Sequence, residues 1–189
     1  IFSCKENIKI DIFNKISKIY ILNLKRRLDR KKLIKYKLNK LGILNYEFYN
    51  GIDSLVDIKS KNAFLNYKNT IDNEDYITKN RLFMNNISNF SILFSYINLI
   101  NYILSIEYNE NDYIIIFEDD IIFNKNISKF KLELNEDVIY LGANQLNFSN
   151  KQNNLQDYKL ENNKKYITYG AYGIVYKICL LYTSDAADE

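Results

Sequence analysis

Three consecutive carboxylates, Glu118, Asp119 and Asp120, follow an apolar run over 113–117, and a second apolar run begins at Ile121. An apolar run without alternation predicts a strand buried on both faces, which is typical of parallel strands in α/β folds. Ligands gather outside the carboxyl ends of such strands. Acids at that position repel one another and resist desolvation unless a cation lies among them. We therefore expect this stretch to form a binding site.

The cation that best fits three carboxylates is Mg²⁺ or Mn²⁺, because both prefer oxygen ligands and bridge to phosphate groups. A second interpretation makes the acids a solvated strand end or a cap of the following helix. The stretch alone leaves both interpretations open.

A basic turn follows the first predicted strand, at 18–24, and leads into a predicted helix at 25–41 that Gly42 ends. Asn23 lies at the carboxyl end of that strand, where its amide could hydrogen-bond a base or ribose. Arg26 and Arg30, four residues apart, would share one helix face and contact a diphosphate, aided by the helix's N-terminal N–H groups. The glycines of a dinucleotide fingerprint or a P-loop are absent. The alternative is an ordinary basic helix face in a Lys-rich chain.

Composition bounds the possible functions. The 189 residues suit one α/β domain, and 47% hydrophobic with 26% charged residues is typical of a globular protein. A net charge of +3 gives no general electrostatic case for nucleic-acid binding. The sequence contains no His, which excludes a histidine base and His-ligated zinc, and only two Cys, which excludes a disulfide framework. The sequence contains no uninterrupted apolar stretch of about 18 residues, so we expect no transmembrane helix.

The remaining patterns predict an α/β order of elements. We expect a strand at 45–49, a long loop with short helices at 53–80, a helix at 88–108 and the acid-bearing strand at 112–117. A short helix at 127–134, a strand at 137–142, a loop at 144–164 and strands at 166–169 and 174–178 around Gly170 and Gly173 complete the set. We expect residues 1–16 to be an extension, 17–181 a domain incomplete at its C-terminal end, and 182–189 a tail of non-native composition.

Four segments in order resemble glycosyltransferase family 25, which includes lipooligosaccharide and procollagen galactosyltransferases. They are Ile19–Arg30 with Leu41-Gly42-Ile43 and Tyr46–Asp53, then Tyr113–Ile121, Val138–Gly142 and Tyr169–Tyr176. The resemblance covers about residues 17–178. It implies a GT-A-type, Rossmann-like nucleotide-binding fold with a mostly parallel central sheet flanked by helices. It also implies a UDP-sugar donor, often UDP-galactose, a glycan or protein acceptor, and transfer of a hexose with inversion.

The resemblance also assigns roles. Asn23, Arg26, Arg30 and Ser95 would contact the donor nucleotide. Glu118 and Asp120 would form the acid-x-acid (DXD-like) metal pair, with Asp120 the first choice of Mn²⁺ or Mg²⁺ ligand and a catalytic residue. Inversion needs a general base, for which Asp119 is a candidate.

The chain departs from the family where a Gly-Cys…Ser-His segment normally precedes the central helix. Ser95 is present, but Tyr96 replaces the histidine and the Gly-Cys pair is missing. This departure keeps open a second hypothesis, a non-catalytic GT-A-like protein that binds a nucleotide sugar or glycan. A receiver-like signalling domain is disfavoured because its acids follow the first strand, where this chain has Lys25 and Arg26. Bacterial relatives of the family indicate a cytoplasmic location, and a lost signal sequence would indicate the secretory lumen.

Overall fold

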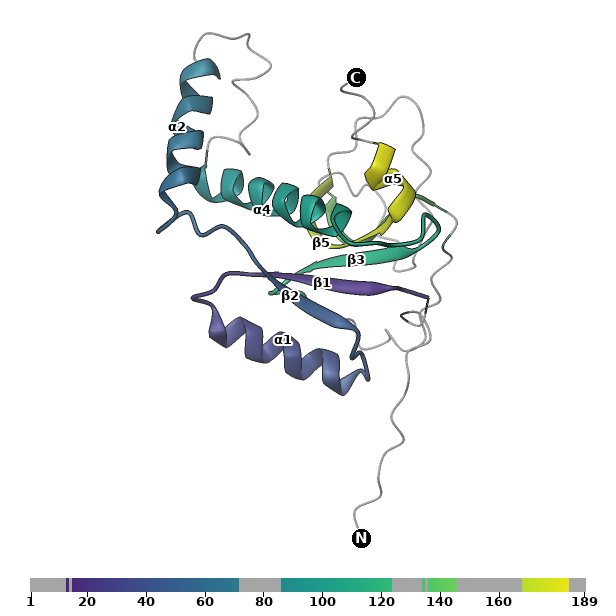
Figure 1. Cartoon of the computed structure of the whole chain (residues 1–189). Coiled ribbons are helices and arrows are strands. Elements are labelled where there is room, and N and C mark those ends of the chain that lie inside the picture. Colours follow the sequence, from purple (N-terminus) through teal and green to yellow (C-terminus); the bar gives the residue numbers. More distant parts are fainter. Residues whose placement is uncertain are drawn as a thin grey trace.

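A computed structural model gives the fold (Figure 1) and describes residues 13, 15–71, 86–123, 134, 136–145 and 168–183. Its elements are β1 (Lys18–Asn23), α1 (Leu28–Lys40), β2 (Tyr46–Asn50), α2 (Ile58–Ile71), α4 (Ile87–Leu104), β3 (Tyr113–Glu118), β4 (Val138–Gln145), β5 (Thr168–Lys177) and α5 (Ile178–Thr183). The predicted helix at 127–134, apart from Leu134, and most of the predicted loop at 144–164 lie outside the described residues.

One five-stranded sheet, in the order β2-β1-β3-β5-β4, forms the centre of the fold. β1 pairs in parallel with β2 and with β3, whereas β5 runs antiparallel to both β3 and β4. The predicted α/β class and its parallel core are confirmed, and the last two strands add an antiparallel part. The carboxyl ends of β1, β2 and β3 meet at one edge, where Asn23 pairs with Asn50 and Leu22 with Glu118.

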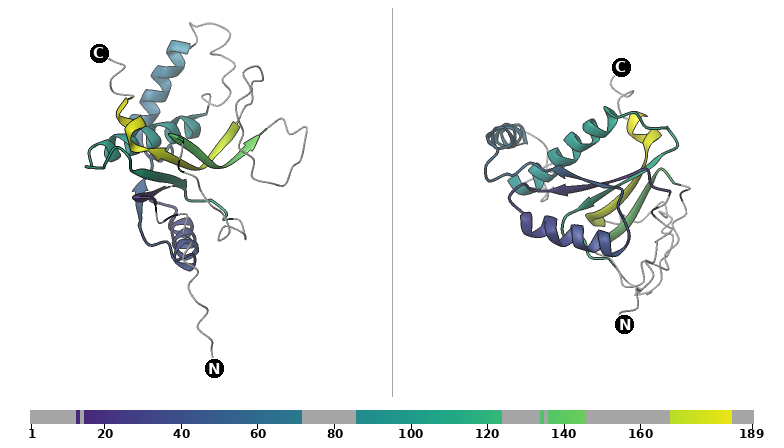
Figure 2. Two further views of the ribbon diagram at one scale, coloured as in Figure 1. Left: turned by 90° about the vertical axis from the view of Figure 1, so that its right-hand side faces the viewer. Right: turned by 60° about the horizontal axis from the view of Figure 1, so that its bottom comes forward.

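Helices cover both faces of this sheet (Figures 1 and 2). Ile34 and Leu38 of α1 pack on one face, in a cluster that also holds Ile19, Ile115 and Phe117. On the other face, residues of α4 and α5 pack against alternate side chains of β1 and β3: Leu99, Ile103, Ile178 and Leu181 against Tyr20, Leu22, Ile114 and Ile116. Burial on both faces explains why β1 and β3 are uninterrupted apolar runs.

α1 begins at Leu28, three residues later than predicted, because the Arg27 N–H bonds to the Leu24 carbonyl and closes a turn first. It ends at Lys40, one residue before the predicted end, with Leu41 as the C-cap. Gly42 adopts a φ of 72°, a left-handed conformation that glycine enters without steric cost.

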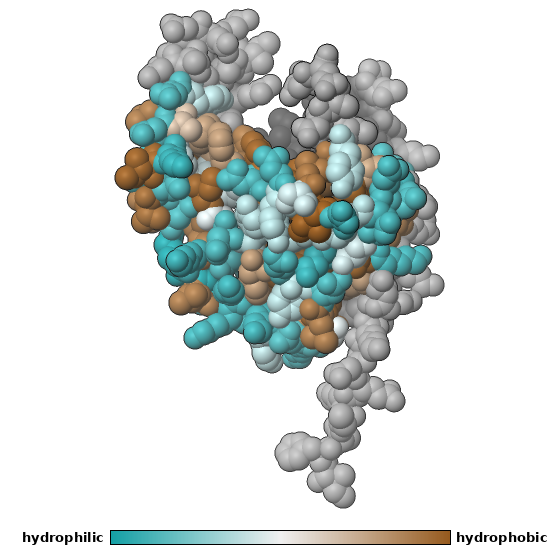
Figure 3. All heavy atoms as spheres, viewed as in Figure 1, coloured by the Kyte–Doolittle hydropathy of each residue, from teal (hydrophilic) through white to brown (hydrophobic). Residues whose placement is uncertain are grey.

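The predicted long loop with short helices at 53–80 contains one helix of 14 residues, α2 at Ile58–Ile71, and residues 72–80 lie outside the described part of the chain. Phe64 and Tyr67 of α2 stack on Phe90 of α4 with ring centroids 5.4 Å apart in each pair. Leu55, Val56, Ile58 and Leu65, in and just before α2, are exposed. Figure 3 shows hydrophobic side chains on the surface around this helix. A helix that buries so few apolar positions gives little periodic signal in its sequence.

β5 is one strand from Thr168 to Lys177, so the prediction of two strands around Gly170 and Gly173 was wrong. Gly173 serves close packing instead of a turn. A Cβ atom there would lie 2.6 Å from Cε1 of Phe117, whose ring lies across the β5 backbone. α5, which follows β5 directly, was not predicted, although its Ile178 and Leu181 are buried.

α4 is, among the described residues, the single helix long and apolar enough by length and composition to span a membrane. Its Leu99 and Ile103 are fully covered by the sheet. One face of α4 therefore packs on the core, while Ile92, Leu93 and Ile97 on the rest of the helix are exposed.

Candidate functional site

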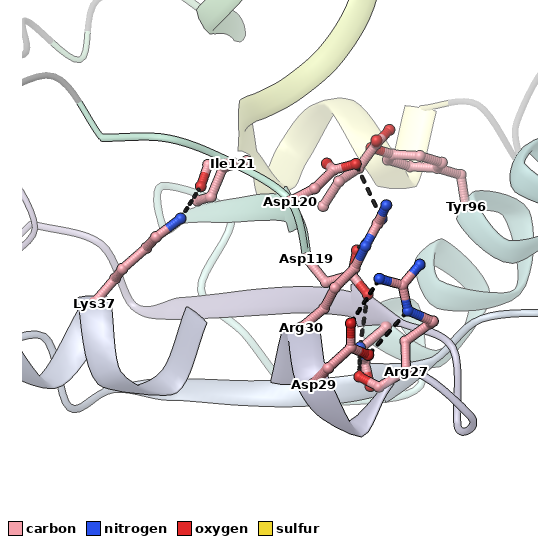
Figure 4. A network of polar contacts seen from close by, with 10 residues as sticks. Arg27, Asp29, Arg30, Lys37, Tyr96, Asp119, Asp120 and Ile121 are labelled. Carbon is pink, nitrogen blue, oxygen red and sulfur yellow. Dashed lines mark hydrogen bonds and ion pairs between the residues drawn. The ribbon is translucent and has the colours of Figure 1, made fainter. Parts of the chain in front are cut away.

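The acids at the end of β3 have different partners, and Figure 4 shows Asp119 and Asp120 beside Arg30. Asp119 is 8% exposed, and its two oxygens accept hydrogen bonds from separate elements. Asn23 Nδ2 donates to Oδ2 at 2.6 Å, and Arg30 Nη1 donates to Oδ1 at 2.9 Å. Asp120 is more exposed and accepts from the same Arg30 Nη1 at 3.0 Å. One guanidinium thus bridges two adjacent carboxylates.

Glu118, the last residue of β3, turns away from Asp119 toward the face of the sheet that α4 covers. The Tyr96 hydroxyl of α4 donates to Glu118 Oε1 at 3.3 Å. Burial raises the pKa of Glu118, and the neighbouring charge of Asp120 raises it further. Burial likewise raises the pKa of the Tyr96 phenol, as does the charge of Glu118. The residue that replaces the family's histidine therefore contacts one of the two predicted metal ligands.

Arg26 and Arg30 do not share a helix face, and this prediction was wrong because Arg26 precedes α1. Arg26 Nε instead donates to Asp53 Oδ2, so the turn after β1 is linked to the loop after β2. Arg27 forms a bidentate pair with Asp29 and lowers the pKa of that carboxyl. Of these three arginines, Arg30 is the one that reaches the acids.

Asn23 is 3% exposed and lies beneath the site. Its Nδ2 donates to the Arg27 carbonyl at 3.2 Å as well as to Asp119. The amide group thus joins the end of β1 to the turn before α1 and to the turn after β3. This geometry favours a positioning role, and its predicted contact with a nucleotide stays a prediction.

Ser95 connects α4 to the end of β2. Its buried Oγ accepts from the Ile52 N–H and donates to the Ser91 carbonyl, both at 2.7 Å. A Cβ at Gly51 would lie 3.3 Å from that oxygen, so the glycine leaves room for the contact. The predicted donor contact of Ser95 stays a prediction, since these two bonds account for its hydroxyl in this structure.

Replacing Ser95 by Ala is expected to lower the free energy of unfolding by about 1–2 kcal/mol, because the Ile52 N–H loses its acceptor. Ser91 supplies the matched control one turn earlier: it is also buried, and its Oγ has no hydrogen-bond partner within the described part of the chain. Ser91→Ala should change the free energy by less than about 0.5 kcal/mol. Urea unfolding of both variants checks the difference, and equal losses would contradict it.

The residues of the site that sequence reasoning missed are Asp53 and Lys37. Asp53 follows β2 at the same edge of the sheet, and an acid after a neighbouring strand was the signal that could have found it. Lys37 Nζ donates to the Ile121 carbonyl at 2.9 Å and fixes the chain that leaves the acids. Nothing in the sequence distinguishes Lys37 from the other lysines of α1.

A divalent cation would find two carboxylates here, those of Glu118 and Asp120. No group of three or more His, Cys, Asp or Glu side chains that could hold a metal exists among the described residues. Burial and the charge of Asp120 raise the pKa of Glu118, while the charge of Arg30 lowers it. Two hard oxygen donors fit Mg²⁺ or Mn²⁺, which commonly take their other ligands from water and phosphate.

Comparison with known proteins identifies the family of the chain. No curated protein matches the chain. The model of "Glycosyltransferase family 25 (LPS biosynthesis protein)" matches residues 16–174, which include every residue of the site. The resemblance drawn from the sequence is therefore confirmed, and the chain belongs to glycosyltransferase family 25.

Proposed function

We propose that the chain is a metal-dependent hexosyltransferase that moves galactose from UDP-galactose to a hydroxyl of a glycan or protein, with inversion. Family membership supports sugar transfer and a role in lipopolysaccharide biosynthesis. The observation that carries the proposal is the contact of Arg30 with Asp119 and Asp120 at the carboxyl edge of the parallel strands. A nucleotide diphosphate needs cationic side chains and its metal needs carboxylates, and both kinds of group lie at this edge.

The topology supports a nucleotide at this edge. β2 lies on one side of β1 and β3 on the other, so the chain changes direction across the sheet at β1. Open α/β sheets bind ligands at such a switch point, outside the carboxyl ends of the strands. A GT-A-type arrangement, with the nucleotide over β1 and the acids of β3 beside it, agrees with this order.

Each residue then has a role. Arg30 turns from Asp120 toward the donor diphosphate, while its bond to Asp119 keeps the guanidinium at the edge. Glu118 and Asp120 would hold Mn²⁺ or Mg²⁺, which would supply Lewis-acid stabilisation of the charge on the departing diphosphate. Asn23 and Asp119 position this apparatus. Both oxygens of Asp119 accept hydrogen bonds, which supports positioning over its candidate role as the base.

Tyr96 favours a second candidate function, a protein that binds a nucleotide sugar or glycan without transfer. Its phenol lies on Glu118 where the family carries a histidine. A phenol with a raised pKa is a poor proton acceptor near neutral pH. For either function we propose a cytoplasmic location, on the analogy of bacterial members of the family.

The test is calorimetric titration of the folded chain with UDP-galactose in Mn²⁺, followed by EDTA. We expect binding that EDTA abolishes. Parallel titrations with UDP-glucose and with sugar nucleotides of other bases define the donor. Failure of the folded chain to bind any of these donors would contradict the proposal, and binding without transfer to any acceptor in a panel would favour the second candidate.

A further inference from the structure

The positive charge of the chain is concentrated in one segment, residues 25–40. It holds nine basic residues and a single acidic one, a net charge of +8, whereas the whole chain carries +3. The rest of the chain is therefore net negative, by five charges. This asymmetry distinguishes α1 from the general Lys-rich composition.

Five of the nine basic side chains have partners inside the molecule. Arg26, Arg27 and Arg30 pair with carboxylates, Lys37 bonds to a carbonyl, and Lys31 lies 4.7 Å from the centroid of the Phe48 ring. The other four are exposed, and none has a hydrogen-bond or ion-pair partner within the described ranges: Lys25, Lys32, Lys35 and Lys40. These four side chains are available to an external anion.

Apolar side chains lie among these lysines. Leu28, Leu33 and Tyr36 are 61%, 53% and 64% exposed. At 100° per residue, Tyr36 lies opposite the face that buries Ile34 and Leu38. Lys32 and Lys40 lie four residues before and after Tyr36 on the same face, so basic and apolar groups alternate along it.

No described element covers this face. The right-hand view of Figure 2 shows α1 along the outside of the molecule, and Figure 3 shows a mostly hydrophilic surface over it, with hydrophobic side chains between. We name Leu28, Lys32, Leu33, Lys35, Tyr36 and Lys40 the outer face of α1.

We propose that the outer face of α1 binds the surface of an anionic phospholipid bilayer. A bilayer interface accepts both kinds of side chain: lysines pair with anionic headgroups, while leucine and tyrosine enter the boundary of the acyl region. A nucleic acid or another polyanion would use the lysines and leave the three apolar groups in water. The proposal does not depend on the donor site.

The orientation that follows suits a membrane-associated reaction. α1 is 13 residues, about 20 Å long, and would lie parallel to the bilayer. Its first turns carry Arg30, which contacts Asp119 and Asp120. The carboxyl edge of the sheet would then lie beside the headgroups, within reach of an acceptor anchored in the lipid.

The test is flotation of the full chain with vesicles of phosphatidylcholine alone and of phosphatidylcholine mixed with phosphatidylglycerol. We expect binding to the anionic vesicles only. Lys32→Gln with Lys40→Gln should weaken the partition coefficient roughly 10- to 30-fold. The control pair Lys15→Gln with Lys59→Gln removes the same charge from exposed lysines elsewhere and should change it less than about twofold.

Tyr36→Ser distinguishes binding to lipid from binding to any polyanion, because it removes an apolar contact and leaves the charge unchanged. We expect it to weaken vesicle binding about threefold or more and to leave adsorption to heparin unchanged. Absence of binding to anionic vesicles, equal losses in the two lysine pairs, or a Tyr36→Ser variant that binds vesicles like the wild type would overturn the proposal. Urea unfolding confirms that each variant is folded.

Discussion

Asp119→Ala is expected to lower the free energy of unfolding by about 3 kcal/mol, while Asp120→Ala next to it changes the value by less than about 0.5 kcal/mol. The Asp119 carboxylate is buried and holds the end of β1, through Asn23, and α1, through Arg30. Its loss leaves the buried amide of Asn23 with one acceptor, the Arg27 carbonyl, in place of two, and leaves Arg30 without its buried partner. Asp120 has a half-exposed side chain and shares Arg30, so its loss leaves no buried group unpaired.

Urea unfolding of the two variants measures this difference. Asp119→Asn tests the geometry further, because an amide offers one acceptor oxygen to two donors. We expect it to lie between the wild type and Asp119→Ala. Equal stability of the two alanine variants would show that Asp119 does not join the three elements.

Gly173→Ala is expected to lower the free energy of unfolding by about 2–3 kcal/mol, since an added methyl group overlaps a buried ring. The new Cβ would lie 2.6 Å from Cε1 and 2.8 Å from Cδ1 of Phe117. That ring cannot move away easily, because it is 3% exposed and packs edge-on against Phe123. The strain would fall on β3 one residue before Glu118.

Gly51→Ala is the matched control, because its Cβ would approach Ser95 Oγ no closer than 3.3 Å. We expect a loss of about 1 kcal/mol or less. Adding Phe117→Leu to Gly173→Ala should recover part of the loss, and the double-mutant cycle isolates the contact between them. A Gly173→Ala protein as stable as the wild type, or no coupling in the cycle, would contradict this explanation of the glycine.

The parts of the fold that follow from buried apolar runs were predictable. β1 and β3 are continuous in the sequence because both of their faces are covered, and Gly42 ends α1 as its position indicated. α2 and α5 were not predictable in the same way. Phe64 is the one buried apolar side chain among residues 58–67 of α2, and α5 has only six residues, too few for a periodic pattern.

The location of the candidate site could be predicted from the sequence, but the contacts between its side chains could not. The acids of β3 and the basic turn after β1 meet at one edge because parallel strands bring their carboxyl ends together. Which acid each arginine contacts depends on side-chain direction and on the start of α1. Because α1 begins three residues later than predicted, Arg26 lies before the helix and contacts Asp53. Arg30 lies within the helix and contacts Asp119 and Asp120.

We propose that Asp120 holds a cation that binds the diphosphate of a sugar nucleotide. The most direct measurement is calorimetric titration of Asp120→Ala with UDP-galactose in Mn²⁺, beside the wild type and Lys40→Ala. We expect the Asp120 variant to stay folded and to bind at least about tenfold more weakly, the equivalent of 1.4 kcal/mol. Lys40→Ala, a surface change of the same helix that bears Arg30, should bind like the wild type. An Asp120→Ala protein that keeps wild-type, EDTA-sensitive affinity would contradict the claim.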